Sequence, residues 1–350
     1  MTVEYAPYVI FAIFSTGLLL VAFRPAWSEW RHPTDTEPLQ VLPNYTSDID
    51  HFADQFREAV MGRLSGDLAS FADVFDFAPD DLDALDWSQV QRPVVCLTTV
   101  KPQRAIRGTA ALFVHGDIDT HVASQFQALL AQGAIRLAPG SVIREWAHGD
   151  GVVHLGKGCA ALRRLSSSTA LELEADCCFE RLQAPLIQLG LSETVPLVRH
   201  TRVPRRPLTE GLLSELDGAL QQTPLLTLVQ GNCKLPRSHR YQGSLIVTGR
   251  LSIGAGTEIF GDVKARGGVV MEAQARVHGA LCSEQQLQLL DQAFVLGPVV
   301  SESVILLGPH VRLGLPEAPT TVSATHIMAE AGAMAHGTVW AREGGVVWAA

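Results

Sequence analysis

The chain has 350 residues, of which 47% are hydrophobic and 7% aromatic, and its formal net charge is −9. A chain of this length and composition can bury more than one core. The negative charge and the lack of a long basic run argue against a nucleic-acid partner. The six cysteines show no CxxC spacing, so we interpret them as small core residues in a reducing compartment.

The N-terminal segment contains 16 consecutive residues without a charged side chain, Tyr8 to Phe23. Together with its flanking residues, this run reaches the length of a membrane-spanning helix. We therefore predict a single uncleaved transmembrane anchor over residues 1–30. Arg24 and Arg31 follow the run and no basic residue precedes it, so the positive-inside rule places the bulk of the chain in the cytoplasm. The expected localisation is the bacterial cytoplasmic (inner) membrane, crossed once.

Residues 31–92 are predicted to form a juxtamembrane tether and a small helical region. The tether contains three prolines, at positions 33, 38 and 43. Apolar residues then follow at helical spacing after Ser47, which we expect to cap the helix. They are Ile49, Phe52, Phe56, Ala59 or Val60, and Leu64. The aspartate-rich stretch that follows, residues 67–87, lacks a calcium-loop motif and is expected to form a solvated acidic face.

Residues 93–191 repeat themselves with a step of 18. Apolar pairs with one residue between them recur at this step: Ile135 and Leu137, Val153 and Leu155, Leu171 and Leu173, Leu189 and Leu191. Residues i and i+2 of a strand point to the same side, so each pair sends two side chains inward. Such a fixed repeat predicts a first β-solenoid array. We interpret Leu112 and Val114 as an earlier rung, separated from the others by a helix-like segment over residues 121–132.

The same step returns in residues 241–345 and predicts a second β-solenoid array. Its apolar pairs are Leu251 and Ile253, Val269 and Met271, Leu287 and Leu289, Ile305 and Leu307. Gly261, Gly279 and Gly297 keep the step too, and we expect them at corners where a Cβ would be crowded. A β-sandwich does not keep such a register, so the predicted fold class is mainly β, a β-helix with 18-residue rungs in two arrays.

Residues 192–240, between the arrays, are predicted to be a Pro- and Arg-rich linker with a short helix. Thr209 is the expected cap of this helix, and one face would carry Leu212, Leu213, Leu216 and Leu220. The linker also holds a basic cluster, which is a candidate surface for anionic lipid or a protein partner. The cluster consists of Arg199, Arg202, Arg205 and Arg206. A merely solvated linker is the alternative.

The second array resembles the polymer-forming domain of the bactofilins. The resemblance rests on the segments GSLIVTGRLSIGAGTEIFGDVKA, GGVVMEAQARVHGAL and LQLLDQAFVLGPVV, and it covers residues 241–340 well and 94–191 more loosely. It implies a right-handed β-helix that assembles end to end into filaments without a nucleotide. It also implies a bacterial cytoskeletal scaffold that lies under the cell membrane and recruits cell-envelope or exopolysaccharide-synthesis enzymes.

Self-association through the ends of the coil is expected on physical grounds as well. An open end presents unpaired backbone groups and an apolar core, so another copy can stack on it. The candidate assembly or partner surface at the C-terminal end consists of Val339, Trp340, Val346, Val347 and Trp348. The alternative is that these residues seal the coil.

Two other functions compete with the scaffold. The apolar residues can also be read at a step of six, which is typical of hexapeptide-repeat acyltransferases. Such an enzyme needs a general-base histidine in a cleft, and none of the twelve histidines stands in a recognisable constellation; His278, for instance, should point outward. We therefore expect no enzymatic activity, catalytic residue, metal or cofactor. The second alternative is a monomeric adaptor subunit of a membrane complex.

Overall fold

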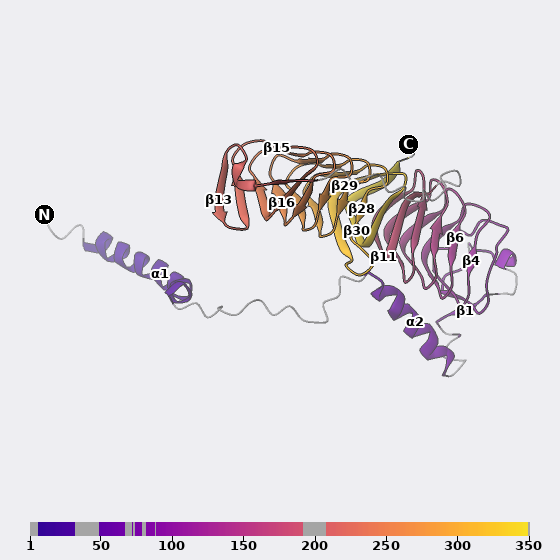
Figure 1. The fold of residues 1–350 in the computed structure, drawn as a ribbon. Coiled ribbons are helices and arrows are strands. Elements are labelled where there is room, and N and C mark those ends of the chain that lie inside the picture. Colours follow the sequence, from indigo (N-terminus) through magenta and orange to yellow (C-terminus); the bar gives the residue numbers. More distant parts are fainter. Residues whose placement is uncertain are drawn as a thin grey trace. The chain divides into compact units, whose positions relative to one another are not determined.

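The computed structural model describes residues 6–31, 49–66, 72, 74–78, 82–87, 89–191 and 208–348. These residues divide into two units. One contains the helix α1 (Ala6–Arg31), and the other contains the helix α2 (His51–Leu64) and all the strands. The second unit is a β-solenoid, which confirms the predicted β-helix (Figure 1).

The N-terminal element is a helix of 26 residues. Among the residues that the structure describes, no helix combines the length and apolar character needed to cross a membrane. The charge-free run ends at Phe23, and the helix reaches its full length only by including charged residues such as Arg24 and Arg31. The predicted transmembrane helix over residues 1–30 is therefore not supported by the structure.

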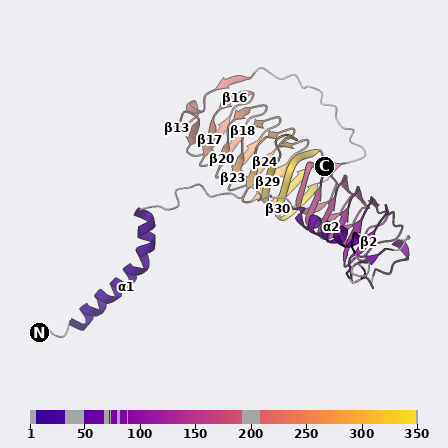
Figure 2. The same ribbon diagram turned by 90° about the horizontal axis from the view of Figure 1, so that it is seen from below.

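The helix α2 confirms the predicted helical region and packs against the outside of the first array (Figure 2). Its buried residues, Ala53 and Val60, contact the outward side chains of Val95, Phe113 and Leu130 on three successive turns. The residue at its N-cap is Asp50, not Ser47, and the Asp50 side chain makes no capping hydrogen bond. The helix therefore depends on tertiary packing, as expected for an amphipathic helix of 14 residues.

The first array runs from β1 to β11 and its strands pair in parallel with the next turn. Its strands are β1 (Asp76–Phe77), β2 (Val94–Cys96), β3 (Ala111–Val114), β4 (Ile118–Asp119), β5 (Gln125–Ala131), β6 (Ile135–Leu137), β7 (Val142–Gly149), β8 (Val153–Leu155), β9 (Ala160–Ser167), β10 (Leu171–Glu174) and β11 (Cys178–Leu191). The residues predicted to point inward, such as Ile135, Val153 and Leu171, are fully buried.

The helix predicted within residues 121–132 is wrong, because this segment holds the strand β5. Leu129 of β5 pairs with Leu112 of β3, an interval of 17 residues instead of 18. The missing residue hides the repeat in the sequence. Leu129 and Leu130 are both buried, one in the solenoid core and the other under α2, and this gives the strand an apolar pattern that imitates a helix.

The second array runs from β12 to β30. Its strands are β12 (Thr209–Gly211), β13 (Ala219–Thr223), β14 (Leu226–Val229), β15 (Cys233–Leu235), β16 (His239–Gln242), β17 (Ser244–Val247), β18 (Leu251–Ile253), β19 (Glu258–Phe260), β20 (Val263–Ala265), β21 (Val269–Met271), β22 (Arg276–Val277), β23 (Leu281–Ser283), β24 (Leu287–Leu289), β25 (Phe294–Val295), β26 (Val299–Ser301), β27 (Val304–Leu307), β28 (Arg312–Leu313), β29 (Thr320–Glu330) and β30 (Ala333–Trp348). The predicted register holds, since Leu251 pairs with Val269 and Val269 with Leu287.

This array begins about thirty residues earlier than predicted, so the helix expected after Thr209 is also wrong. Only a three-residue 3₁₀ helix forms there, Leu213–Glu215. Gly218, at φ +72°, adopts a left-handed conformation within the expected helix and directly precedes β13, which forms a hairpin with β14. The 18-residue step already operates between Cys233 and Leu251.

Gly261 and Gly279 lie where a Cβ would be crowded by the preceding turn, as predicted from their spacing. A Cβ on Gly261 would lie 2.3 Å from the carbonyl oxygen of Gly243 in the preceding turn, and one on Gly279 would lie 2.5 Å from that of Gly261. A Cβ atom essentially never lies this close to another heavy atom, so each turn can stack on the next only if these corners lack a side chain.

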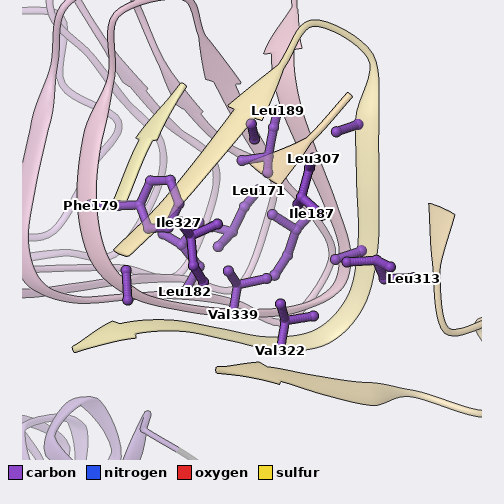
Figure 3. Packing of buried hydrophobic residues seen from close by; sticks show 14 of the residues in the cluster. Leu171, Phe179, Leu182, Ile187, Leu189, Leu307, Leu313, Val322, Ile327 and Val339 are labelled. Carbon is purple, nitrogen blue, oxygen red and sulfur yellow. The ribbon is translucent and has the colours of Figure 1, made fainter. Parts of the chain in front are cut away.

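The two arrays meet at their C-terminal turns. The strand β11, which ends the first array, pairs in an antiparallel manner with β30, which ends the second. Figure 1 shows β1 at one end of the unit, β13 at the other, and β11 beside β30 in the middle. Figure 3 shows the cores joining at this place, with Leu182 and Ile187 of one array beside Val322 and Val339 of the other. The two arrays thus form one continuous stack whose halves run in opposite directions.

Candidate functional surfaces

The residues predicted to form an assembly surface lie at the junction between the two arrays. They all belong to β30, which has β29 on one edge and β11 on the other. Val339 and Val347 are fully buried in the core, and Val346 is half-buried opposite Cys178. Trp340 and Trp348 are 37% and 55% exposed. Both edges of this strand are thus occupied by the chain's own strands.

The fit of β30 against β11 depends on a close approach at Gly345. A Cβ on Gly345 would lie 2.2 Å from the ring of Phe179, its partner in β11. The ring can cover the strand only because glycine stands there. The glycine opposite Phe179 therefore makes the surfaces of the two C-terminal turns complementary.

The basic cluster of Arg199, Arg202, Arg205 and Arg206 lies outside the described residues. Its role as a lipid- or partner-facing surface stays a prediction.

The N-terminal end of the second array presents a strand edge that no described strand covers. The edge strand β13 pairs only with β14, through the hairpin. Its sequence, ALQQT, contains no charged residue, and four of its five side chains are exposed. Three leucines on and around the hairpin are unusually exposed for their type: Leu212 at 60%, Leu220 at 47% and Leu225 at 70%. We call these leucines and β13 the hairpin edge.

The N-terminal end of the first array differs from the hairpin edge. The strand at this end, β1, has only two residues. One of them, Asp76, forms an ion pair with Arg92 at 3.8 Å. Leu82, Trp87 and Val90 fold over the core and are buried in it. A very short strand with a charged side chain is a poor template for another strand.

A polar network joins α2 to the first array. His148 of β7 is buried, its Nδ1 lies 2.8 Å from the Ser166 hydroxyl, and its Nε2 lies 3.2 Å from the Asp150 carboxylate. Arg57 of α2 donates a hydrogen bond to the same carboxylate. The sequence did not reveal this cluster, because its members are brought together by neighbouring turns and by the docking of α2. Ser166 is buried in it, so we interpret the network as structural.

This network predicts a pH-dependent stability. Burial lowers the pKa of His148, an effect that outweighs the opposing charge of Asp150, and Arg57 lowers it further. In the unfolded chain the imidazole binds a proton below about pH 6.5, whereas in the folded chain it does so only at lower pH. The unfolded state therefore binds more protons in this window, and the free energy of unfolding should fall as the pH decreases from about 7 to 5.5.

The measurement is the urea midpoint of the wild-type chain and of His148→Gln across this pH range. Glutamine keeps a hydrogen-bonding side chain without the titration, so the variant should lose less stability on acidification. Equal pH dependence of the two proteins would contradict the assignment to His148.

His278 lies on the outer face, as predicted, but not as an isolated solvated side chain. Its ring stacks on that of Phe260, with centroids 4.2 Å apart and planes 3° from parallel, and its edge faces Phe294. Within the described ranges, no group of three or more His, Cys, Asp or Glu residues is placed to hold a metal ion.

The geometry defines the chain as a β-solenoid made of two opposed arrays. In comparisons with protein-family models, with curated proteins and with solved structures, nothing matches this chain. The resemblance to the bactofilins thus stays a hypothesis that rests on the repeat.

Proposed function

We propose that this chain is a structural scaffold that self-associates through the hairpin edge of its second array. The observation that carries the proposal is the uncharged strand β13, whose outer edge no other described strand covers, with three exposed leucines on and around its hairpin. Natural sheets normally protect such an edge with charges, prolines or a covering segment. A second strand laid on β13 would satisfy its free backbone groups and remove Leu212, Leu220 and Leu225 from water.

A second copy of the chain is the partner that the edge fits best. Two β13 strands laid antiparallel about Gln221 place Ala219 of each copy opposite Thr223 of the other, and no like charges meet. Such a contact is isologous and closes on itself. Antiparallel joining of two solenoid ends already occurs inside the chain, where β11 meets β30.

This arrangement favours a closed dimer over a filament. The C-terminal turns of the two arrays pair with each other, so neither is open to another copy. The opposite end of the first array is closed by β1, a short strand with a charged side chain. One associating end per chain yields a pair of chains and no further growth. The scaffold so formed is a long rigid rod that presents the same surfaces twice. By the bactofilin resemblance, the partner held on it would be a protein of cell-envelope or polysaccharide synthesis.

The test is analytical ultracentrifugation of the full chain at rising concentration. The wild type should pass from monomer to dimer, and the double variant Leu220→Lys, Leu225→Lys should stay monomeric because the contact would have to take ammonium groups out of water in place of leucine side chains. The double variant Gln285→Lys, Gln286→Lys, which adds the same two charges at exposed positions in the middle of the second array, is the matched control and should dimerise normally.

Two results would count against the proposal. A wild type that is monomeric at all concentrations would favour the monomeric adaptor instead. Species that keep growing beyond the dimer, or filaments in electron micrographs, would show that an end other than the hairpin edge also associates.

A further inference from the structure

A single row of outward-pointing side chains crosses six strands of the first array. It consists of Val95, Phe113, Leu130, His148, Ser166 and Gln183, each paired with the next across the sheet. Directly paired residues on neighbouring strands point to the same side of a sheet. All but Gln183 are buried, although they lie on the outside of the solenoid. They are covered by α2, which Figure 2 shows lying against the first array.

One half of this row is apolar. Ala53 and Val60 of α2 pack on Val95, Phe113 and Leu130. These residues belong to a hydrophobic cluster of their own, separate from the core inside the solenoid. The strands beneath are held together by their own parallel ladders. The helix can therefore leave the row without opening the solenoid core, as expected of a unit that unfolds locally.

The other half of the row is polar, and α2 contacts it through hydrogen bonds. Arg57 donates to the Asp150 carboxylate, which also lies 3.2 Å from Nε2 of His148. Next to the start of α2, the backbone N–H of Ile49 donates to the side-chain oxygen of Gln183 at 2.9 Å. His148 thus lies at the centre of the contact and shares one carboxylate with the helix.

We propose that α2 is an acid-released strap, which covers the row at neutral pH and undocks from it when His148 is protonated, while the solenoid stays folded. The strands on either side of β7 place the uncharged Leu130 and Ser166 beside the imidazole. Undocking would expose the apolar residues Val95, Phe113 and Leu130 on the first array. This release is independent of the hairpin edge, which belongs to the second array.

The direction of the pH effect follows from the charges around the imidazole. Burial lowers the pKa of His148 in the docked state, and the carboxylates of Asp150 and Asp50 oppose this effect without cancelling it. Arg57 lowers the pKa further. Undocking brings the imidazole into water, so its pKa returns toward about 6.5. The undocked state therefore binds more protons between about pH 7 and 5.5, and acidification shifts the equilibrium toward it.

The test is amide hydrogen exchange of the full chain, followed by mass spectrometry at pH 7.5 and 5.5 and corrected for the intrinsic effect of pH. The opening constant of the α2 amides should rise at least about threefold on acidification. At both pH values these amides should exchange at least about tenfold faster than those of β8 and β10, because α2 opens without the solenoid. A low concentration of urea should accelerate exchange in β8 and β10 more than in α2, since local opening exposes little surface.

Two variants connect the effect to one side chain. His148→Gln should remove the pH dependence of the α2 opening constant. His154→Gln is the matched control and should keep it, because His154 lies elsewhere on the first array, between Glu172 and Glu174.

Three results would overturn the proposal. The first is exchange of the α2 amides at the rate of β8 and β10, which would mean that the helix is released only when the array unfolds. The second is a wild-type opening constant that does not change with pH. The third is a His148→Gln variant that keeps the pH dependence of the wild type. The first two need no variant, so they remain decisive even if a substitution prevents folding.

Discussion

Val339→Lys is expected to destabilise the chain by about 3 kcal/mol or more, because it places an ammonium group without a partner in the core. Val339 is fully buried and pairs with Leu182 across the junction between the two arrays. A substitution on an open end of the coil would weaken only the association between copies, whereas a substitution at Val339 should lower the free energy of unfolding. We expect chemical denaturation to show a lower midpoint and a separation into two transitions, as each array loses its neighbour.

Trp348→Lys is the matched control, since this residue ends the same strand and is 55% exposed. It should change the free energy of unfolding by no more than about 0.5 kcal/mol. If both substitutions leave one transition with the wild-type midpoint, the junction is not formed in solution.

Leu287→Asp should lower the free energy of unfolding by several kcal/mol, whereas Gln288→Asp should be nearly neutral. Leu287 is fully buried and stacks between Val269 and Ile305 of the adjacent turns, so the carboxylate would lack both water and a partner. Gln288, the next residue along β24, points outward and is half-buried. Urea denaturation of the two variants measures the difference.

The comparison tests the inward and outward assignment of the whole second array, because every turn keeps the same register. Equal destabilisation by the two substitutions would mean that the assignment is wrong, since a one-residue slip exchanges the two faces of a strand.

The solenoid itself could be predicted from the sequence because its stabilising contacts repeat. Leu251, Val269 and Leu287 occupy equivalent positions on successive turns, so the pairing of one turn predicts the pairing of the next. The corner glycines follow the same logic. The prediction failed where the step changes by a single residue, as between Leu112 and Leu129, or where a glycine in the left-handed conformation, Gly218, interrupts an apolar pattern of helical spacing.

The junction could not be predicted in this way. The pairing of Arg181 with Trp340 joins residues that share no repeat, and its antiparallel direction is opposite to that of the turns on either side. The hairpin edge was missed because two of its leucines, Leu212 and Leu220, were assigned to a helix.

The opposed direction of the two arrays sets the order in which the molecule can be completed during synthesis. The edge of β11 emerges from the ribosome long before its cover, because β30 is the last strand of the chain. At about 5–20 residues per second, the delay is roughly ten to thirty seconds. During that interval the nascent first array carries a bare 14-residue strand edge and an open apolar core. Until β30 has been made, this edge is open to pairing with a strand of another chain.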